Sequence, residues 1–305
     1  MPRRKGIFAM EVRQLQIFCA LAEELNFTRT AERVHTVQSN VTTQIRALEE
    51  ELGTPLFDRL AKRVVLTDAG QRFLPYAEKA LTAMTEGRSA VCHGSEPAGP
   101  LRIGAPESVL AYRLPEVLQC FRKRHPQVEL IFRPHWDETL WDALEGGRLD
   151  MAIRMIDAID NPQCASVRLR TERVYLIAHP EHPLVRRRAV GPQDLAGEML
   201  LLTEAGCAYR KKLDELLASH KVRAGNITEF SSVEAIKQCA TAGMGIGLLP
   251  EIVVAAELNR KQLRSLTWVG PDLDIATHIV WHKDKWLSPG MVAFLDLLQE
   301  KLQAA

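Results

Sequence analysis

Apolar residues recur at helical spacing near the N-terminus and predict successive helices. The first helix is expected over residues 12–25, with a buried stripe of Val12, Leu15, Phe18, Cys19, Ala22 and Leu25. Thr28 is suited to cap a second helix, in which Ala31 and Val34 face inward. Because Ala31 is small, the neighbouring helices can approach each other closely.

A third helix is predicted over residues 38–52, with one apolar and one polar face. The apolar face consists of Val41, Ile45, Leu48 and Leu52, and the polar face of Ser39, Asn40, Thr43, Arg46 and Glu50. A helix that reads the major groove of DNA needs short polar side chains on the face that enters the groove. The amides of Gln38 and Asn40 can pair with adenine, and Thr43 can meet a thymine methyl group. An ordinary amphipathic surface helix is the alternative interpretation.

A β-hairpin with a basic tip is predicted directly after the third helix. Gly53 suits a helix end, and PLFDRLAKRVVLTDAG fits turn, strand, tip, strand and helix start. The basic residues at the tip, Arg59, Lys62 and Arg63, can contact phosphates or the minor groove. Thr67 is expected to cap the following helix. A solvated loop is the alternative, but the position after the third helix favours a winged helix-turn-helix.

One long helix is predicted over residues 68–93, with Pro75 near its start. Its apolar positions follow the alternating spacing of a coiled-coil seam, flawed at Arg88, and are Leu74, Ala77, Leu81, Met84, Arg88 and Val91. We interpret this segment as a linker helix that pairs two chains, so that two heads read a two-fold DNA site. A helix that packs only on its own domain is the alternative.

Strands and helices alternate from residue 96 onward, after the Pro/Gly hinge EPAGP. The strands LRIGAP, VELIF and LDMAIR are separated by helical segments, and a comparable run extends from RVYLIAHP to GIGLLP. ATHIVWHKD and a helix from Pro289 are expected to return to the first half. This alternation predicts doubly wound parallel sheets in two similar lobes.

The predicted fold class is therefore α/β overall: a winged helix-turn-helix, a long linker helix, and a two-lobed α/β domain of periplasmic-binding-protein type. The expected boundaries are a disordered extension at 1–9, the winged helix-turn-helix at 10–67, the linker helix at 68–95 and the effector-binding domain at 96–305. Within the last domain, lobe I covers about 100–170 and 275–305, and lobe II about 171–274.

The composition and net charge of the chain do not indicate a function, but they restrict which functions are possible. The chain is 46% hydrophobic and carries a net charge of +1, so any affinity for DNA must come from local placement of charge. Arg29 and Arg33 are well placed for this, whereas the acidic residues Glu23, Glu24, Glu49, Glu50 and Glu51 must point elsewhere. No apolar run approaches the about 20 residues of a membrane span, and no signal peptide is evident, so we expect a cytoplasmic protein without a membrane partner.

No metal site or cofactor is expected. The six cysteines are widely scattered, and His179 and His182 lie in a Pro-flanked loop that is read as a connection. Motifs of hydrolases, P-loop enzymes, metalloproteases and dinucleotide-binding enzymes are missing from the sequence, which argues against an enzyme.

Residues 44–59 fit the pattern Q-I-R-A-L-E-x-x-L-G-x-P-L-F-x-R, and residues 66–70 fit L-T-x-A-G. Together with Ala31, Gln38 and Val41, they resemble the LysR-type transcriptional regulators, and the resemblance covers essentially the whole chain. It implies a DNA-binding regulator that responds to a small-molecule effector. It also implies a homodimer formed through the linker helix, a homotetramer built as a dimer of dimers, and RNA polymerase as a further partner.

The expected contacts to double-stranded operator DNA are Thr28, Arg29, Gln38, Ser39, Asn40, Thr42, Thr43, Arg46, Arg59, Lys62 and Arg63. Three positions depart from the family pattern: Val37 replaces a usual serine, Thr43 a common arginine, and Asn40 a small residue. Thr36 is expected to cap the third helix in place of the missing serine. Because Asn40 and Thr43 face the groove, the operator is expected to differ from a family-average one.

Ligands of two-lobed sheets lie beyond the carboxyl ends of the strands, between the lobes. The resemblance implies the same corners, and the candidate effector-binding residues there are Pro106, Glu107, Ser108, Arg154, Thr203, Glu204, Cys207, Ser231, Ser232 and Val233. Arg154 can hold a carboxylate, which makes a small carboxylate the candidate effector. Glu107 argues against a highly anionic ligand unless Arg154 neutralises it. Simple helix caps at Ser108, Thr203 and Ser232, and a surface ion pair at Arg154, are the alternatives.

Cys207 offers a second kind of signal, because a helix N-terminus and the following Arg210, Lys211 and Lys212 can lower the pKa of its thiol. The resemblance includes members that sense peroxide through a cysteine in this region, but their resolving cysteine has no counterpart here. A redox-sensing regulator is thus one alternative function. A solute-binding protein without a role in transcription is another, opposed by the N-terminal head.

Overall fold

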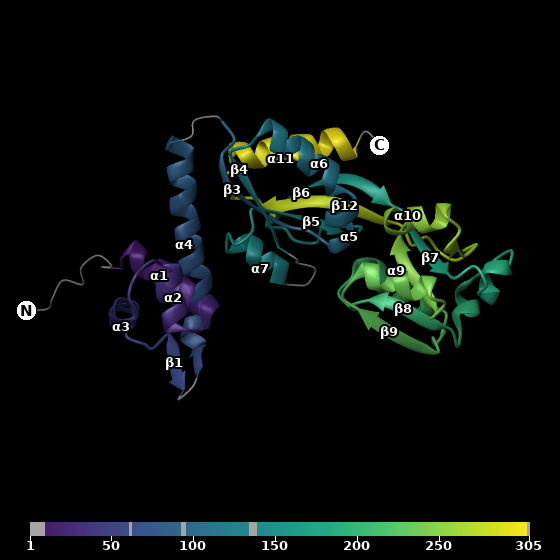
Figure 1. Cartoon of the computed structure of the whole chain (residues 1–305), viewed down its shortest axis with the longest axis horizontal. Helices are drawn as coiled ribbons and strands as arrows, with labels where there is room; N and C mark the ends of the chain where they lie inside the picture. Colours follow the sequence, from purple (N-terminus) through teal and green to yellow (C-terminus); the bar gives the residue numbers. More distant parts are fainter. Residues whose placement is uncertain (1–9, 61–62, 93–95, 134–138, 304–305) are drawn as a thin grey trace, which may run out of the picture. The chain divides into compact units, whose positions relative to one another are not determined.

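The computed structural model describes residues 10–60, 63–92, 96–133 and 139–303. The chain forms two compact units (Figure 1): one contains the N-terminal helices and hairpin, and the other contains two five-stranded sheets. The expected disordered extension at residues 1–9 lies outside the described residues.

The N-terminal unit contains four helices and one hairpin among its described residues. Its elements are α1 (Val12–Glu24), α2 (Phe27–Arg33), α3 (Gln38–Leu52), β1 (Phe57–Leu60), β2 (Arg63–Leu66) and α4 (Asp68–Cys92). Phe18 lies at the centre of the core, with its ring centroid 5.5 Å from that of Phe57 and 5.1 Å from that of Phe73. Val41 and Ile45 of α3 are fully buried in the same cluster, so the core fixes the back of α3.

The buried stripe of α1 differs at both ends from the sequence-based prediction. Val12 and Leu25 are exposed, whereas Ile17 and Leu21 are fully buried beside Phe18. Leu25 is exposed because it ends α1 in the left-handed conformation, where the chain turns away from the core.

Asn26 caps α2 in place of Thr28. Its side-chain oxygen accepts hydrogen bonds from the backbone N–H groups of Thr28 and Arg29, at 2.9 and 3.1 Å. The helix therefore begins at Phe27 rather than after Thr28.

The helix α3 has the predicted bounds, but the expected cap at Thr36 is wrong. Val37 is the N-cap residue, and no side chain in the described part of the chain caps this end. The hydroxyl of Thr36 instead accepts a hydrogen bond from the side-chain amide of Asn40, at 2.9 Å. At the other end, Gly53 adopts a φ of +70°, the left-handed conformation that favours glycine.

Thr67 joins the hairpin to α4. Its hydroxyl accepts a hydrogen bond from the N–H of Gly70 at 3.0 Å and donates to the carbonyl of Pro55 at 2.8 Å. A Cβ atom on Gly70 would lie 2.2 Å from the carbonyl oxygen of Leu56, so only glycine permits this close approach.

The predicted seam along α4 divides into two parts. Ala77 is buried, and Leu74 and Leu81 pack against the core of the same unit. Met84 is 52% exposed and Val91 is 84% exposed. Packing on its own domain thus accounts for the first part of the seam, whereas the second part is open to a partner.

The first sheet of the second unit defines lobe I and has the strand order β4-β3-β5-β12-β6. Its elements are β3 (Gly99–Gly104), α5 (Glu107–Tyr112), α6 (Leu114–Arg124), β4 (Val128–Arg133), α7 (Thr139–Glu145), β5 (Met151–Met155), β6 (Cys164–Glu172), β12 (Ile275–His282) and α11 (Pro289–Leu302). Strands β3, β4 and β5 are parallel, but β12 runs antiparallel to β5 and β6. The sheet is therefore mixed rather than wholly parallel.

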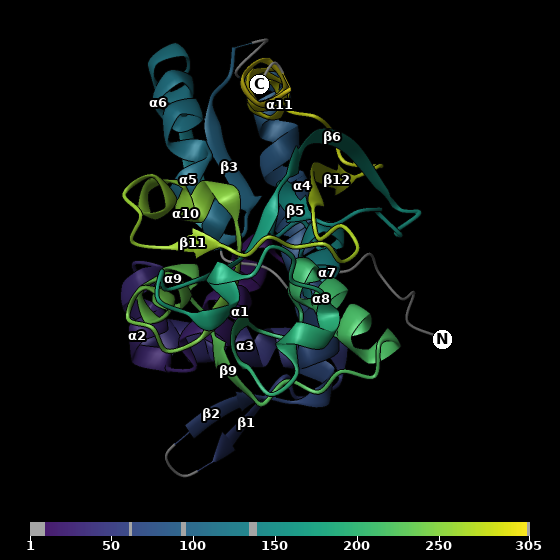
Figure 2. The same cartoon turned by 90° about the vertical axis from the view of Figure 1, so that its right-hand side faces the viewer.

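The second sheet defines lobe II and has the strand order β11-β7-β10-β8-β9. Its elements are β7 (Val174–Ala178), η1 (Pro183–Arg186), η2 (Pro192–Leu195), β8 (Met199–Thr203), α8 (Ala208–Ser219), β9 (Asn226–Phe230), α9 (Val233–Thr241), β10 (Ile246–Pro250), α10 (Glu251–Asn259) and β11 (Arg264–Ser265). Figure 2 shows α10 of this lobe beside α5 of lobe I, and the two helices are in contact.

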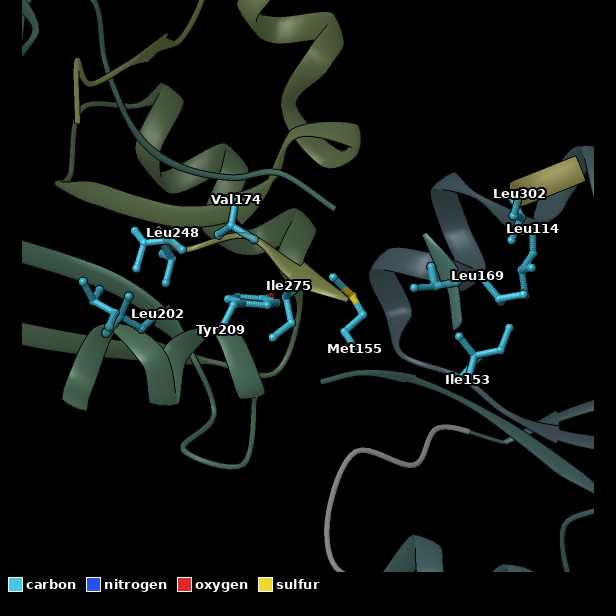
Figure 3. Packing of buried hydrophobic residues seen from close by; sticks show 14 of the residues in the cluster. Leu114, Ile153, Met155, Leu169, Val174, Leu202, Tyr209, Leu248, Ile275 and Leu302 are labelled. Atoms are coloured by element: carbon cyan, nitrogen blue, oxygen red, sulfur yellow. The ribbon is translucent and has the colours of Figure 1, made fainter. Parts of the chain in front are cut away.

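The chain crosses between the lobes after β6 and again before β12, and the apolar core continues through these crossings. Figure 3 shows Met155, Tyr209 and Ile275 between the residues of the two lobes, in one continuous cluster. Beside the first crossing, Arg113 donates to the buried carboxylate of Glu172 through two hydrogen bonds of 2.9 and 2.6 Å. This paired geometry satisfies both carboxylate oxygens where the chain changes lobes.

The position of Phe18 generates a stability prediction for the N-terminal unit. Phe18→Ala removes a fully buried ring and is expected to lower the free energy of unfolding of this unit by about 3–5 kcal/mol. Val12→Ala, at a position that is 38% exposed, is the matched control and should change it little. Denaturant unfolding followed by circular dichroism measures both. Equal effects of the two substitutions would contradict the assigned core.

Candidate functional site

The front of α3 carries an exposed polar surface. Gln38, Ser39, Thr43 and Arg46 are exposed, while the apolar residues behind them are buried. Thr28 and Arg29 of α2 are exposed as well, and the Thr28 hydroxyl donates to the side-chain oxygen of Gln38 at 3.4 Å. The starts of both helices thus contribute to one polar surface.

Asn40 and Thr42 are only half-exposed on this surface. The amide nitrogen of Asn40 donates one hydrogen bond to Thr36, which leaves its second N–H and its carbonyl oxygen for other partners. The hydroxyls of Thr42 and Thr43 donate to the carbonyls of Gln38 and Ser39, at 3.1 and 2.9 Å. Each hydroxyl oxygen can still accept a hydrogen bond from a ligand.

Three acidic residues near this surface, Glu23, Glu24 and Glu49, are bound within the unit, whereas Glu50 and Glu51 are exposed. Arg33 lies 2.5 Å from Glu23 and 3.1 Å from Glu24, so these two carboxylates already pair with its guanidinium. Glu49 accepts hydrogen bonds from the N–H groups of Leu56 and Phe57, at 2.8 and 3.2 Å. On the hairpin, Arg63 is exposed; Lys62 and the side chain of Arg59 lie outside the described residues.

A cavity of about 80 Å³, partly open to solvent, lies between lobe I and lobe II. Its lining consists of Pro106, Glu107, Ser108, Arg154, Met155, Thr203, Glu204, Gly206, Cys207, Ala208, Tyr209, Phe230, Ser231 and Val233. Every predicted effector-binding residue except Ser232 is in this lining. Sequence reasoning missed Met155, Gly206, Ala208, Tyr209 and Phe230, although all of them closely follow or precede a residue that it had selected.

Three helices begin at this cavity. The N-cap residues are Pro106 for α5, Cys207 for α8 and Ser232 for α9. The Ser232 hydroxyl accepts from the N–H of Ala235 at 3.4 Å, whereas no described side chain caps α8. Helix N-termini carry partial positive charge and unpaired N–H groups, which can bind an anion, whereas Glu107 and Glu204 in the same lining oppose one.

The polar side chains of the cavity are unequally satisfied. Thr203 is 9% exposed, and its hydroxyl interacts with the side chain of Tyr209. Ser108 donates to the sulfur of Met155 at 3.5 Å, a weak acceptor. Burial and the nearby Cys207 raise the pKa of Tyr209 well above its ordinary value, so its hydroxyl remains a neutral donor. Arg154 lies over the ring of Trp141, 5.8 Å from its centroid.

Glu107 connects the two lobes across one edge of the cavity. It begins α5 in lobe I, and its carboxylate accepts from the Ser232 hydroxyl at 3.0 Å and from the N–H of Val233 at 2.8 Å. Ser232 is therefore joined to the site through Glu107 although it does not line the cavity. The second lobe supplies both donors.

A polar cluster strengthens the same edge. Tyr112 donates to Glu234 at 2.6 Å, and the buried ammonium of Lys237 donates to Tyr112 at 3.0 Å and lies 2.8 Å from Glu234. Hydrogen bonds from Lys237, Tyr112 and Gln238 lower the pKa of Glu234 from 4.5 to about 2. Burial lowers the pKa of Lys237, but its bonds to Glu234 and Tyr112 outweigh this and raise it.

The basic residues that follow Cys207 are occupied elsewhere. Arg210 donates to the carbonyl of Thr203 and to Glu229, Lys211 pairs with Glu215, and Lys212 lies 3.0 Å from Asp157. Cys207 is a free thiol, as are Cys19, Cys120, Cys164 and Cys239. The positive charges that were expected to activate the Cys207 thiol are therefore paired with acidic side chains.

Within the part of the chain that the structure describes, no group of His, Cys, Asp and Glu residues is arranged to hold a metal ion. None of the described helices combines the length and the apolar character that a membrane span requires.

Two family models cover most of the sequence. The model of the bacterial regulatory helix-turn-helix protein, lysR family, matches residues 12–71, and the model of the LysR substrate binding domain matches residues 94–303. The chain belongs to the LysR family of transcriptional regulators. It is thus a DNA-binding regulator with an effector-binding domain, and the family consists of regulators rather than enzymes.

Relatives of this LysR-type regulator match over nearly their full lengths. The HTH-type transcriptional regulator YwqM of Bacillus subtilis strain 168 is 41% identical over 297 residues, which are 95% of this chain and 99% of the relative. GltR of the same strain, also an HTH-type transcriptional regulator, is 31% identical over 96% of this chain and 98% of its own.

Solved structures share the fold of the LysR-type regulator. A full-length OxyR variant from Pseudomonas aeruginosa has a TM-score of 0.74 at 24% identity, over 96% of this chain and 95% of that one. Full-length CbnR, solved in complex with its target DNA, has a TM-score of 0.69 at 24% identity, over 96% and 100% of the two chains. At these identities the likeness concerns the fold alone.

The low pKa of Glu234 generates a pH prediction for the regulator. Because the pKa is lower in the folded chain, the stabilisation is fully present above pH 4.5 and is lost as the pH falls toward about 2. Wild type should therefore have a higher Tm than Glu234→Gln at neutral pH, and the difference should shrink on acidification below pH 4.5. Glu116→Gln, at an exposed position in α6, is the control. A difference between wild type and Glu234→Gln that does not vary with pH would contradict the assignment.

Proposed function

We propose that this LysR-type regulator reads operator DNA with the polar front of α3 and answers to a small carboxylate bound between the two lobes. The observation that carries the effector proposal is that the uncapped N-terminus of α8, Arg154 and the buried hydroxyl of Thr203 all line one cavity of the described chain. These groups supply positive potential and hydrogen-bond donors to one carboxylate.

The proposed DNA contacts divide into two kinds. Gln38, Ser39 and Thr43 lie on the first turns of α3, where side chains reach base edges in the major groove. Arg29 and Arg46 flank them and are exposed, so they can neutralise phosphates. The hairpin adds Arg63 at the wing, together with Arg59 and Lys62 from the sequence prediction. Thr28, Asn40 and Thr42 complete this surface.

The proposed effector contacts come from both lobes. Arg154 and Ser108 belong to lobe I, whereas Thr203 and the first N–H groups of α8 belong to lobe II. The apolar part of the lining suits a compact hydrocarbon portion of the ligand. A ligand that touches both lobes stabilises one degree of lobe closure, and the regulator transmits that closure to its DNA-binding heads.

We propose that the regulator is a homotetramer built as a dimer of dimers. The exposed residues Met84 and Val91 offer one self-association surface on α4. A second lies at β4, an edge strand of its sheet, beside a groove lined in part by Leu118, Val128, Leu130 and Phe132. Two separate surfaces of this kind allow dimers to pair.

We further divide the chain at the predicted boundaries, with the winged helix-turn-helix at 10–67, the linker helix at 68–95 and the effector-binding domain at 96–305. Since its target is promoter DNA, the regulator acts in the cytoplasm, with RNA polymerase as a further partner.

The DNA interface is tested by the salt dependence of binding. Arg46→Ala should weaken binding to the regulator's own upstream region and reduce the slope of log K against log salt by about 1, the effect of one lost phosphate contact. Arg33→Ala is the matched control, because Glu23 and Glu24 already hold this guanidinium. Gel-shift titrations at several salt concentrations measure both slopes. An unchanged slope for Arg46→Ala would remove this residue from the interface.

The effector cavity is tested with two substitutions in a thermal-shift screen of small carboxylates. For a compound that stabilises wild type, Thr203→Val should weaken binding about tenfold through loss of one hydrogen bond, and Arg154→Ala should abolish the response. DNA binding should persist in both variants. Thr241→Val is the control, because its hydroxyl bonds within α9. Full binding of the compound by both cavity variants would place the effector elsewhere.

A further inference from the structure

The N-terminus of α9 already holds a carboxylate, and the chain itself supplies it. Glu107 accepts from the N–H of Val233 at 2.8 Å and from the Ser232 hydroxyl at 3.0 Å. Both donors belong to the opposite lobe, more than a hundred residues away in the sequence. An N-terminal N–H group with an adjoining hydroxyl forms a carboxylate-binding position, because charge-assisted hydrogen bonds add to the helix dipole.

Glu107 is the first residue of α5, and its carboxylate reaches from lobe I to the first N–H of α9 in lobe II. Its negative charge offsets the positive end of α9. One side chain thus neutralises this helix end and joins the lobes.

The N-terminus of α8 differs from that of α9 in the same cavity. Ser232 and Glu107 occupy the start of α9, whereas no described side chain caps α8. Beside α8, the side chain of Thr203 is nine-tenths buried and lines the cavity next to Tyr209. The cavity therefore offers two positions for an anion, of which one is filled.

We propose that Glu107 is a built-in carboxylate ligand of lobe II, which occupies the anion position at α9 and directs the effector to α8. A free carboxylate takes the α9 position only when Glu107 is absent or has left it. Glu107 thereby determines specificity: the cavity receives an effector through a single anionic group, and a second anionic group competes with Glu107. The statement about the effector rests on the proposed function; the occupancy of α9 by Glu107 does not.

The lobes have a second connection on the same edge, which keeps the experiment interpretable. Tyr112, Glu234 and Lys237 join α5 to α9 without Glu107. Removal of Glu107 should therefore open the α9 position without unfolding the domain.

Chemical rescue of Glu107→Ala by acetate tests the proposal, because acetate replaces the side-chain atoms beyond Cβ. Hydrogen exchange is followed in the full-length protein, in peptides that cover Ser232 to Ala235. Without acetate, the Val233 amide of the variant should exchange about tenfold faster than in wild type or more, as expected for loss of a charge-assisted bond. Sodium acetate at constant ionic strength should restore this protection and raise the Tm of the variant, with no such effect on wild type.

Glu204→Ala is the matched control, because it removes another carboxylate from the same lining and leaves α9 unchanged. Its Val233 amide should exchange as in wild type, with or without acetate. Unchanged exchange in Glu107→Ala, or equal acetate effects on that variant and on wild type, overturns the proposal. If Glu107→Ala does not fold, Glu107→Gln replaces it. The glutamine oxygen can accept from Val233 without the negative charge, so protection should be intermediate between wild type and free exchange; full wild-type protection overturns the proposal.

The test needs neither effector nor DNA, so its failure is distinguishable from failure of the proposed function. A regulator that binds its operator and a carboxylate effector, but shows no acetate rescue, refutes only the role of Glu107.

Discussion

The arrangement of the effector domain depends on one electrostatic constraint: three helices direct their N-termini at a single cavity. Such an arrangement concentrates unpaired N–H groups and positive potential where the lobes meet. A negative group is needed to neutralise this potential. At the N-terminus of α9 the chain supplies the carboxylate of Glu107 as this negative group. At the N-terminus of α8 no described side chain caps the helix, so its first N–H groups can donate to a ligand. Ligand recognition and lobe closure thus depend on the same helix ends.

The two chain crossings between the lobes connect this electrostatic constraint to the rest of the effector domain. The apolar core continues through Met155, Tyr209 and Ile275, so the lobes are not independent domains joined by a loose linker. Glu172 is held by Arg113 at the point where the chain changes lobes, which fixes the crossing. A ligand that changes the contacts at the cavity therefore acts on lobes that share one core.

The N-terminal unit was predictable where one local signal dominates. The bounds of α3 follow from an uninterrupted apolar period that ends at Gly53, and the hairpin follows from two short strand segments on either side of a basic tip. The helix caps were harder to predict, because Asn26 and Thr28 are both good capping residues and lie only two positions apart. The seam of α4 shows the same limit: apolar spacing marks a buried face, but it does not say whether the unit's own core or a second chain covers it.

In the effector domain, strand-to-helix corners located most of the cavity lining, because ligands of such sheets lie at the carboxyl ends of strands. The bond of Glu107 to Val233 could not be predicted, since it depends on how closely the two lobes approach. The family resemblance likewise could not reveal that the basic residues after Cys207 pair with Glu229, Glu215 and Asp157. Pairing of this kind depends on side-chain directions that sequence spacing leaves open.

A crystal structure of the regulator with a bound effector tests the central claim most directly. The account predicts the effector carboxylate against the first turn of α8, within hydrogen-bond distance of Thr203, with Glu107 still bound to Ser232 and Val233. An effector carboxylate on the α9 N-terminus with Glu107 turned away, or an effector bound outside this cavity, would contradict it.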